Sequence, residues 1–328
     1  MSVDLGLSPD EQSVEELFHA FFTKESPTSV AREAEPLGFD RTLWDKLAET
    51  GAPGMAVDGA SLGELVVACE ELGRAIAPVP LVEHLVASRA HRSPELCDGS
   101  TVATISLRPA VHGVWPLVPA GAIADVIVGV DGDELVAVRS LPPGEGLRNH
   151  ADAPLADRST SGDRVMLGPA SEFERVRAEW QTLTAASLVG IAGAALDLGV
   201  EYAKTRFQFG VPIGSFQAVQ HMLADIPGMI DGARLLTHKA AWAEGRDWID
   251  VDHNEYEHQL ALASMAFVFA SDVAAHATDR SLHVHGGYGF AREYDIQLYY
   301  RRARGLTLIL GEPGAECRHL ADRLFGSR

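Results

Sequence analysis

The sequence is poor in cysteine and has no excess of basic residues, and both shortages limit what the protein can be. Its three cysteines, Cys69, Cys97 and Cys317, lie far apart and follow no CxxC or Cys/His spacing. Neither a disulfide framework nor a zinc or iron–sulfur site is therefore expected. The 46 acidic residues outnumber the 27 basic ones, for a formal net charge of -19. Such a charge repels nucleic acid and anionic membranes, so we expect neither as a partner.

Long apolar runs and a targeting segment are also missing. No run of eighteen apolar residues occurs, and the first residues, MSVDLGLSPDEQ, lack the basic start and apolar block of a signal peptide. The composition, 46% hydrophobic and 22% charged, is typical of a globular protein. We expect a cytoplasmic protein without membrane insertion, and 328 residues allow two or three domains.

Helix signals fill residues 1–97, which we predict to be an N-terminal helical domain. Ser8 with Glu11, and Ser61 with Glu64, have the spacing of a capping box, in which each side chain accepts from the backbone N–H of the other residue at the start of the helix. Apolar residues follow each box at helical spacing.

Residues 98–170 change to short β-branched runs. TVATISLR, ADVIVGV and ELVAVRSL are separated by Gly, Pro and Asp, and DGDE between the last two predicts a hairpin turn. We predict a small β-domain, built as an antiparallel sheet or barrel.

Residues 171–328 are predicted to form a C-terminal four-helix bundle, which makes the fold class α+β. Ser171 and Glu174 suggest a third capping box, and Pro227 should kink or end the second helix. The small residues of AASLVGIAGAAL, 185–196, permit neighbouring helices to approach closely. The predicted helical blocks lie near residues 172–205, 215–244, 252–283 and 314–325.

Two stretches of this last part carry chemistry. In RFQFGVPIGSFQ, Arg206 ends one helix and Gln217 starts another, an arrangement that suits an anion because a helix N-terminus has free N–H groups. The alternative is an arginine that caps a helix, with core phenylalanines. In HVHGGYGFAREY, Gly286 and Gly287 allow the backbone to turn and another body to approach. The alternative there is a plain glycine C-cap.

In this order the two stretches resemble the acyl-CoA dehydrogenase family. RFQFGVPIGSFQAVQHMLAD is similar to that family's Arg-x-x-Phe-Gly-x-Pro-Ile-x-x-Phe-Gln-x-x-Gln-x-x-Leu-Ala-Asp pattern, and HVHGGYGFAREYDIQLYYRRAR to its Gly-Gly-x-Gly segment. The resemblance implies a helical domain, a β-domain and a four-helix bundle. It also implies α,β-dehydrogenation of an acyl-CoA thioester with FAD as cofactor.

The resemblance further implies which residues bind FAD. They would contact the adenosine diphosphate end of the FAD of a neighbouring subunit, which requires at least a dimer. These residues are Arg206, Gln208, Phe209, Gln217, His283, Gly286 and Gly287.

The sequence departs from the family at the positions of the catalytic base. One usual position, on a loop near the C-terminus, falls on Leu310 or Gly311, and the other, on the first bundle helix, falls on Trp180. None of these can take a proton. Glu312 and Glu179 are the nearest carboxylates, but one residue along a helix is a rotation of about 100°, so we expect Glu179 to be solvated.

The family's usual flavin-ring contacts are also missing between Ser100 and Pro169, where Trp115 has no comparable context, and Arg302 replaces a usual aspartate. We therefore hypothesise one subunit of a heteromeric enzyme, an α2β2 tetramer with a homologous acyl-CoA dehydrogenase subunit that supplies the base. Steroid-derived CoA thioesters are the expected substrates, and an electron-transfer acceptor is a further expected partner. The alternatives are a stand-alone dehydrogenase that uses a displaced glutamate and a non-catalytic structural paralogue.

Arg301, Arg302 and Arg304 could meet a CoA phosphate or lie on a helix surface paired with acidic residues.

Overall fold

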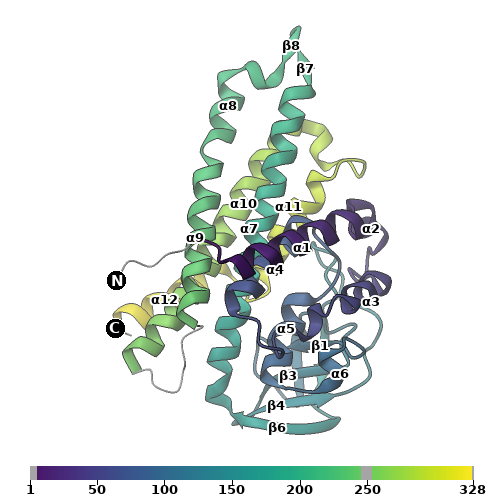
Figure 1. Ribbon diagram of the computed structural model, residues 1–328, viewed down its shortest axis with the longest axis vertical. Coiled ribbons are helices and arrows are strands. Elements are labelled where there is room, and N and C mark those ends of the chain that lie inside the picture. Colours follow the sequence, from purple (N-terminus) through teal and green to yellow (C-terminus); the bar gives the residue numbers. More distant parts are fainter. Residues whose placement is uncertain (1–5, 245–252, 327–328) are drawn as a thin grey trace.

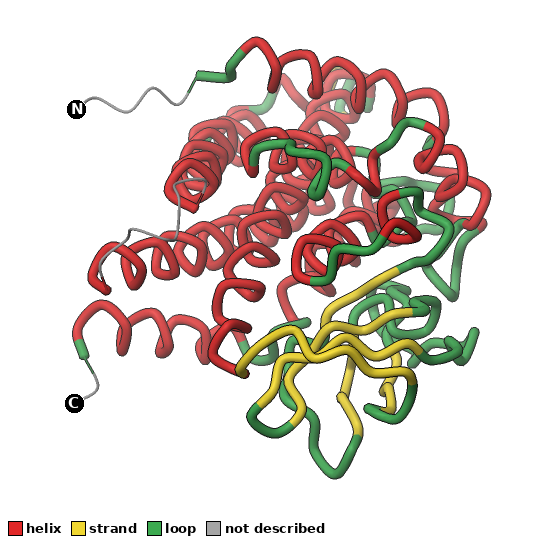
Figure 2. The backbone as a smooth tube through the Cα atoms, turned by 60° about the horizontal axis from the view of Figure 1, so that its bottom comes forward, coloured by secondary structure: helices red, strands yellow, loops and turns green. Residues whose placement is uncertain are grey.

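The computed structural model describes residues 6–244 and 253–326, which form the three expected parts in the expected order. In Figure 1 the long helices run along the vertical axis, the sheet lies at their lower end and the N-terminal helices lie against their side. Figure 2 shows the strands gathered on one side of the helices. The α+β fold class is confirmed. The domain boundaries stay a prediction, since one hydrophobic core runs through all three parts.

The N-terminal part is helical, and both of its predicted capping boxes form. Ser8 accepts from the backbone of Glu11 while Glu11 reaches back to Ser8, and Ser61 and Glu64 do the same. These pairs satisfy N–H groups that a helix leaves free at its start. The helices are α1 (Pro9–Glu25), α2 (Thr28–Glu33), α3 (Arg41–Glu49), the 3-10 turn η1 (Ala52–Gly54), α4 (Leu62–Arg74), α5 (Leu81–Ala90) and α6 (Pro94–Cys97).

The β-domain contains a four-stranded sheet of order β1-β3-β4-β6 and a separate pair, β2-β5. The predicted DGDE hairpin joins β3 to β4. The expectation of a purely antiparallel sheet is wrong, because β1 pairs with β3 in parallel; the chain passes through β2 before it returns to the sheet. The strands are β1 (Ala103–Ile105), β2 (Val114–Val118), β3 (Val126–Asp131), β4 (Glu134–Arg139), β5 (Ala156–Ser159) and β6 (Asp163–Pro169).

Trp115 belongs to the core of this domain. Its ring is fully buried among Val118, Ile127 and Val136, and its Nε1 donates to the carbonyl of Val130 at 2.7 Å. A buried indole N–H needs such a partner. Trp115 therefore serves packing, in agreement with its lack of a flavin-binding context in the sequence.

The C-terminal part holds more helices than the four predicted blocks. The segment at 296–308, noted in the sequence only for its motif, forms a helix of its own, α11. The break at Pro227 is confirmed, because one helix ends at Ala224 and the next begins at Ile226. The elements are the 3-10 turn η2 (Ala170–Glu172), α7 (Phe173–Thr205), β7 (Phe207–Gln208), β8 (Val211–Pro212), η3 (Ile213–Ser215), α8 (Gln217–Ala224), α9 (Ile226–Glu244), α10 (His253–His285), η4 (Gly286–Phe290), α11 (Ile296–Leu308) and α12 (Pro313–Phe325).

The third predicted capping box is wrong. Ser171 lies in the short turn η2, and the N-cap of α7 is Glu172, which makes no side-chain cap. Glu174 instead accepts from Arg323 of α12 at 2.9 Å. A charged donor makes a stronger hydrogen bond than a hydroxyl or an amide, so the carboxylate binds across the fold and not to its own helix start.

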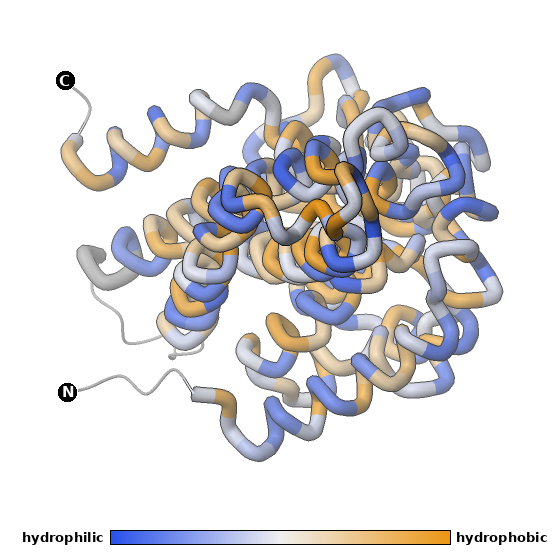
Figure 3. The backbone as a smooth tube through the Cα atoms, turned by 90° about the horizontal axis from the view of Figure 1, so that it is seen from above, coloured by the Kyte–Doolittle hydropathy of each residue, from blue (hydrophilic) through white to orange (hydrophobic). Residues whose placement is uncertain are grey.

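Helices α7 and α10 form the centre of the bundle and pack against each other. Both are long and apolar enough to span a membrane by length and composition alone, but 72% and 67% of their most apolar windows are buried inside the protein. Figure 3, seen along the bundle, shows hydrophobic positions concentrated in the middle of the molecule. Burial in the core thus accounts for their composition.

The small-residue stretch of α7 does allow a close helix crossing. Gly190 lies so near α4 that an added Cβ would be 1.9 Å from the carbonyl oxygen of Glu70, and one on Gly73 would be 2.0 Å from that of Ser187. The Ser187 hydroxyl donates to the carbonyl of Cys69 at 3.0 Å. The crossing therefore joins the N-terminal part to the bundle backbone against backbone.

This crossing generates a stability prediction. We expect Gly190→Ala to lower the free energy of unfolding by about 1–3 kcal/mol, because the added methyl group overpacks the α4–α7 contact. Gly193→Ala is the control: its Cβ would meet only Arg74 side-chain atoms at 3.6 Å or more, and alanine favours a helix by about 1 kcal/mol over glycine. Urea unfolding followed by circular dichroism measures both, and equal losses would contradict the close crossing.

Candidate functional site

A short hairpin at the upper end of the bundle carries the first chemical motif. Strands β7 and β8 pair through a two-residue turn, and both turn residues have positive φ, 54° at Phe209 and 83° at Gly210. Such a type I′ turn favours Asn-Gly, and a left-handed conformation costs a residue other than glycine about 1–2 kcal/mol. The Phe209 side chain is nevertheless 93% exposed. A strained, exposed phenylalanine indicates a contact made outside this chain.

The second motif lies where α10 ends. Gly286 has a φ of 61°, a conformation that glycine adopts without strain, and Gly287 follows it in η4. A Cβ on either residue would meet nothing within 4 Å. The backbone here is therefore open to the approach of another molecule.

The fold brings the two motifs together. The guanidinium carbon of Arg206 lies 5.3 Å from the centre of the Tyr288 ring, a cation–π contact between the hairpin base and η4. Beneath it, Tyr202 stacks on His285 with ring centres 4.1 Å apart, and Tyr294 meets both rings edge-on. We call Tyr202, His285, Tyr288 and Tyr294 the aromatic platform. A cation beside stacked rings suits a ligand with both phosphate and a planar base.

The remaining predicted residues lie around this platform with different orientations. Gln208 is exposed on the hairpin, and Gln217 starts α8, whose first turn has no side-chain cap. His283 is exposed on the last turn of α10, whereas His285 is buried and bonds the carbonyl of Ser281 at 2.7 Å. Burial lowers the pKa of His285, so it is neutral near pH 7. The sequence pointed to His283 and missed the platform's own histidine.

Glu179 is buried, and the expectation of a solvated carboxylate is wrong. Only 5% of it is exposed, because residues of α5 and of the β-domain line the cleft beside it. Its carboxylate pairs with Arg89 and Arg175, each at 3.6 Å. It lies at a cleft of about 350 Å³ that Arg92 also lines.

Glu312 has a structural role at the start of α12. It is the N-cap, and its carboxylate accepts from the backbone of Gly314 at 2.9 Å and from Arg318 at 3.1 Å. These hydrogen bonds, led by the one from Gly314, lower the pKa of Glu312. Its side chain is 69% exposed. An ionised capping carboxylate at the surface lacks the raised pKa and the enclosure typical of a catalytic base.

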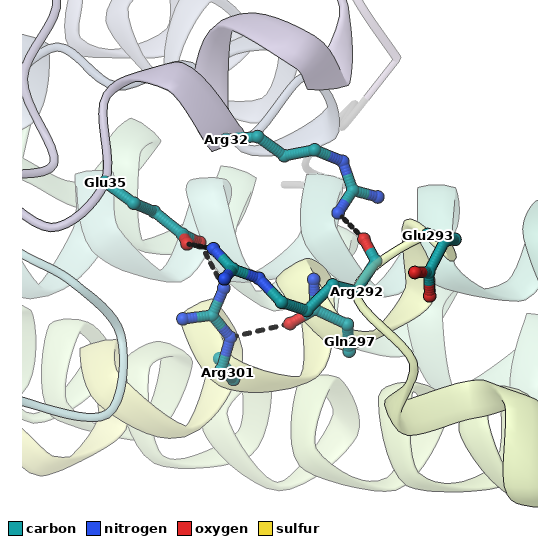
Figure 4. Close-up of a pocket in the computed structure, with 6 residues that line it drawn as sticks. All are labelled: Arg32, Glu35, Arg292, Glu293, Gln297 and Arg301. Carbon is teal, nitrogen blue, oxygen red and sulfur yellow. Dashed lines mark hydrogen bonds and ion pairs between the residues drawn. The ribbon is translucent and has the colours of Figure 1, made fainter.

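The three arginines of α11 do not form one basic patch. Arg301 pairs with Glu35 and Asp152, and Arg304 lies over the Tyr300 ring at 5.4 Å. Arg302 is partly buried and lines two small cavities. Figure 4 shows Arg301 directed toward Glu35 in an open cleft of about 540 Å³, where Arg32 donates to the carbonyl of Arg292. The paired alternative holds for Arg301, and neither alternative foresaw an Arg302 that lines cavities.

Glu83, a partly buried residue that no sequence motif singled out, lies beside one of the two base positions. Glu83 of α5 accepts a hydrogen bond at 3.4 Å from Trp180, the residue at one of the two base positions. Glu83 and Arg302 line the same two cavities, of about 70 and 60 Å³. Burial raises the pKa of Glu83 and lowers that of Arg302. A lone glutamate in the apolar stretch VPLVEHLVA was the available signal.

Comparison with known proteins gives the family. Residues 8–91 match the acyl-CoA dehydrogenase N-terminal domain and residues 179–325 the acyl-CoA dehydrogenase C-terminal domain. The chain belongs to the acyl-CoA dehydrogenase family. It is therefore related to FAD-dependent oxidoreductases that act on CH–CH bonds, and the FAD expected from the sequence is confirmed as the family's cofactor. No His, Cys, Asp or Glu cluster suited to a metal occurs among the described residues.

Named relatives are similar over nearly the whole chain. Acyl-CoA dehydrogenase IpdE2 of Mycolicibacterium smegmatis is 29% identical, over 97% of this chain and 100% of its own length. The ChsE4-ChsE5 complex of Mycobacterium tuberculosis has a TM-score of 0.86 at 23% identity, over 99% of this chain and 100% of that one. The Tcur3481-Tcur3483 steroid ACAD has a TM-score of 0.81 at 26% identity, over 96% and 97%.

The described residues fit the nucleotide end of FAD. Arg206 supplies a cation, the aromatic platform offers stacking faces, and the open backbone at Gly286 and Gly287 leaves room for a diphosphate. Of the platform's rings, that of Tyr288 is exposed, whereas His285 is buried and Tyr202 and Tyr294 pack partly against the core.

A substitution at the hairpin separates function from stability. We expect Phe209→Asn to raise the free energy of unfolding by about 1 kcal/mol, because Asn-Gly favours the type I′ turn. In a complex with a homologous partner chain, the same variant should retain less FAD, since an exposed aromatic contact is lost. Absorbance at 450 nm per protein after gel filtration measures FAD. Phe207→Asn, on the neighbouring strand, is the control, and full FAD retention by Phe209→Asn would exclude a role in cofactor binding.

Proposed function

We propose that this chain is one subunit of a heteromeric FAD-dependent acyl-CoA dehydrogenase. The enzyme removes hydrogen from the α and β carbons of a CoA thioester, and a homologous partner subunit supplies the catalytic base and the flavin-ring contacts. This chain contributes Arg206, Phe209 and the aromatic platform to the nucleotide end of the partner's FAD. FAD, once bound, supplies the acceptor for the hydride.

The observation that carries the proposal is the contrast between the two ends of α7. At the hairpin end, strained and exposed groups are open to another body, whereas at the other end no carboxylate stands where the family places its base. Trp180 is fully buried there, and Leu310 and Gly311 cannot accept a proton. A chain built in this way needs a second chain for proton transfer.

The comparisons support a heteromeric assembly and a steroid-derived substrate. Two of the similar structures are named as pairs of different proteins, ChsE4-ChsE5 and Tcur3481-Tcur3483, and the second pair is described as a steroid ACAD. An α2β2 tetramer acting on steroid-derived CoA thioesters in the cytoplasm, with an electron-transfer protein as acceptor, is the matching assignment for this chain. The strongly acidic surface fits partners other than nucleic acid.

A stand-alone dehydrogenase is the second candidate. Glu179 favours it, since this carboxylate is buried beside a cleft of about 350 Å³. Two guanidinium groups flank it, however. The same glutamate would have to release both arginines in order to take a proton from a substrate.

Flavin content tests the proposal. Co-expressed with a homologous partner, this chain should yield a complex with one FAD per pair of unlike chains, and alone it should hold none. In the complex, Arg206→Ala should lose most of the FAD, because the cation at the nucleotide end is removed.

Lys204→Ala is the control, since Lys204 is an exposed cation two residues away that pairs with Glu201. Absorbance spectra of the purified complexes give the ratio of FAD to protein. A colourless complex, or FAD retained by Arg206→Ala, would rule the proposal out. Turnover of an acyl-CoA by this chain alone would favour the stand-alone candidate.

A further inference from the structure

The three parts of the fold meet around Arg302 and Glu83. Arg302 lies on α11 and Glu83 on α5, and both line two cavities. The smaller cavity is also lined by β-domain residues, including Pro119, Ala120 and Pro154. Ile309, which precedes the predicted base position, lines the same cavity from the end of α11. Trp180, at the other predicted base position, donates to Glu83.

The space at this junction is small. The two cavities measure about 70 and 60 Å³, whereas sites for drug-sized ligands occupy roughly 300–1,000 Å³. A three-ring flavin does not fit into either of them. The side chains of Arg302 and Glu83 stand between the two cavities, since both residues line both.

The charged and unpaired polar groups at this junction also disfavour binding of the neutral, planar flavin ring. Arg302 makes no hydrogen bond or ion pair with any residue in ranges 6–244 and 253–326; only the attraction of more distant carboxylates, Glu83 first, offsets its burial. Thr184 is 1% exposed, and its buried hydroxyl has no partner. It lines the larger cavity. Arg302 and Glu83 are partly buried. Reducing the hydration of a charge without a close partner, or burying an unpaired hydroxyl, costs free energy, so packing alone does not explain these groups.

We infer that Arg302 and Glu83 close this chain's own flavin-ring position and so confine the flavin of the complex to the partner subunit. The inference rests on the proposed function. In this inference the Arg302 and Glu83 side chains prevent a second flavin from binding in this chain. The nucleotide end, where Gly286 and Gly287 leave open space, has no comparable obstruction.

The test uses the co-expressed complex and lumiflavin, an isoalloxazine ring without phosphate or adenosine. In this chain, Glu83→Ala and Arg302→Ala are combined, so that no lone charge is left buried. The wild-type complex should bind no lumiflavin beyond its FAD. The double variant should keep its FAD and bind close to one lumiflavin per pair of unlike chains in equilibrium dialysis.

The matched control removes an exposed ion pair on α3, with Arg41→Ala and Asp45→Ala together. It should leave lumiflavin binding at the wild-type level. The inference is overturned if the wild-type complex binds lumiflavin stoichiometrically, if it carries two FAD per pair, or if the folded double variant gains no binding.

A crystal structure of the wild-type complex grown with excess FAD gives an independent answer if the double variant does not fold. Flavin-ring density between α5 and α11 of this chain would refute the inference, and a ring only in the partner, with Arg302 and Glu83 inside the junction, would support it. The proposed function is tested by a different experiment, and it is refuted if the Arg206→Ala complex retains its FAD. A gain of lumiflavin by the double variant would then still support the closed junction.

Discussion

The close crossing of α4 and α7 is the constraint on which the rest of the structure depends. Gly73 and Gly190 let the two helices touch through their backbones, and this contact ties the N-terminal helices to the bundle. α7 has 33 residues, so at 1.5 Å per residue it is about 50 Å long. Its two ends are therefore held at a fixed distance, with the hairpin at one end and the three-part junction at the other.

The two ends of α7 lie in different environments. At the hairpin end Phe209 has a strained backbone and an exposed side chain, and the backbone of Gly286 and Gly287 is open. A contact with a molecule outside this chain would offset the free-energy cost of this strain and exposure. The junction end is closed, and its polar groups face inward with few partners. In a dehydrogenase that joins subunits through a shared cofactor, such a division lets one chain keep a binding surface while its own reaction site is lost.

What the sequence could predict was local. Both N-terminal capping boxes depend on side chains three residues apart, and the β3–β4 hairpin depends on one turn, so short stretches were sufficient. Arg206 and Gly286 were found because each lies in a motif with fixed spacing. The contact between the two motifs, through Tyr288 and the aromatic platform, needed the fold. His283 and His285 differ by about 200° around a helix, and the motif alone did not show which of them faces inward.

What the sequence could not predict arises from contacts between distant segments. Glu179 was expected in solvent because only its own helix was considered, and α5 and the β-domain bury it. The parallel pairing of β1 with β3 depends on the path of the chain through β2. Glu83 and Arg302 come from different domains, and each alone looks like an ordinary charged residue in a helix. Their convergence on the same two cavities, with Trp180 hydrogen-bonded to Glu83, appears only in the fold. It is the observation from which we infer a closed flavin-ring position, since a position without proton-transfer chemistry has no reason to stay open.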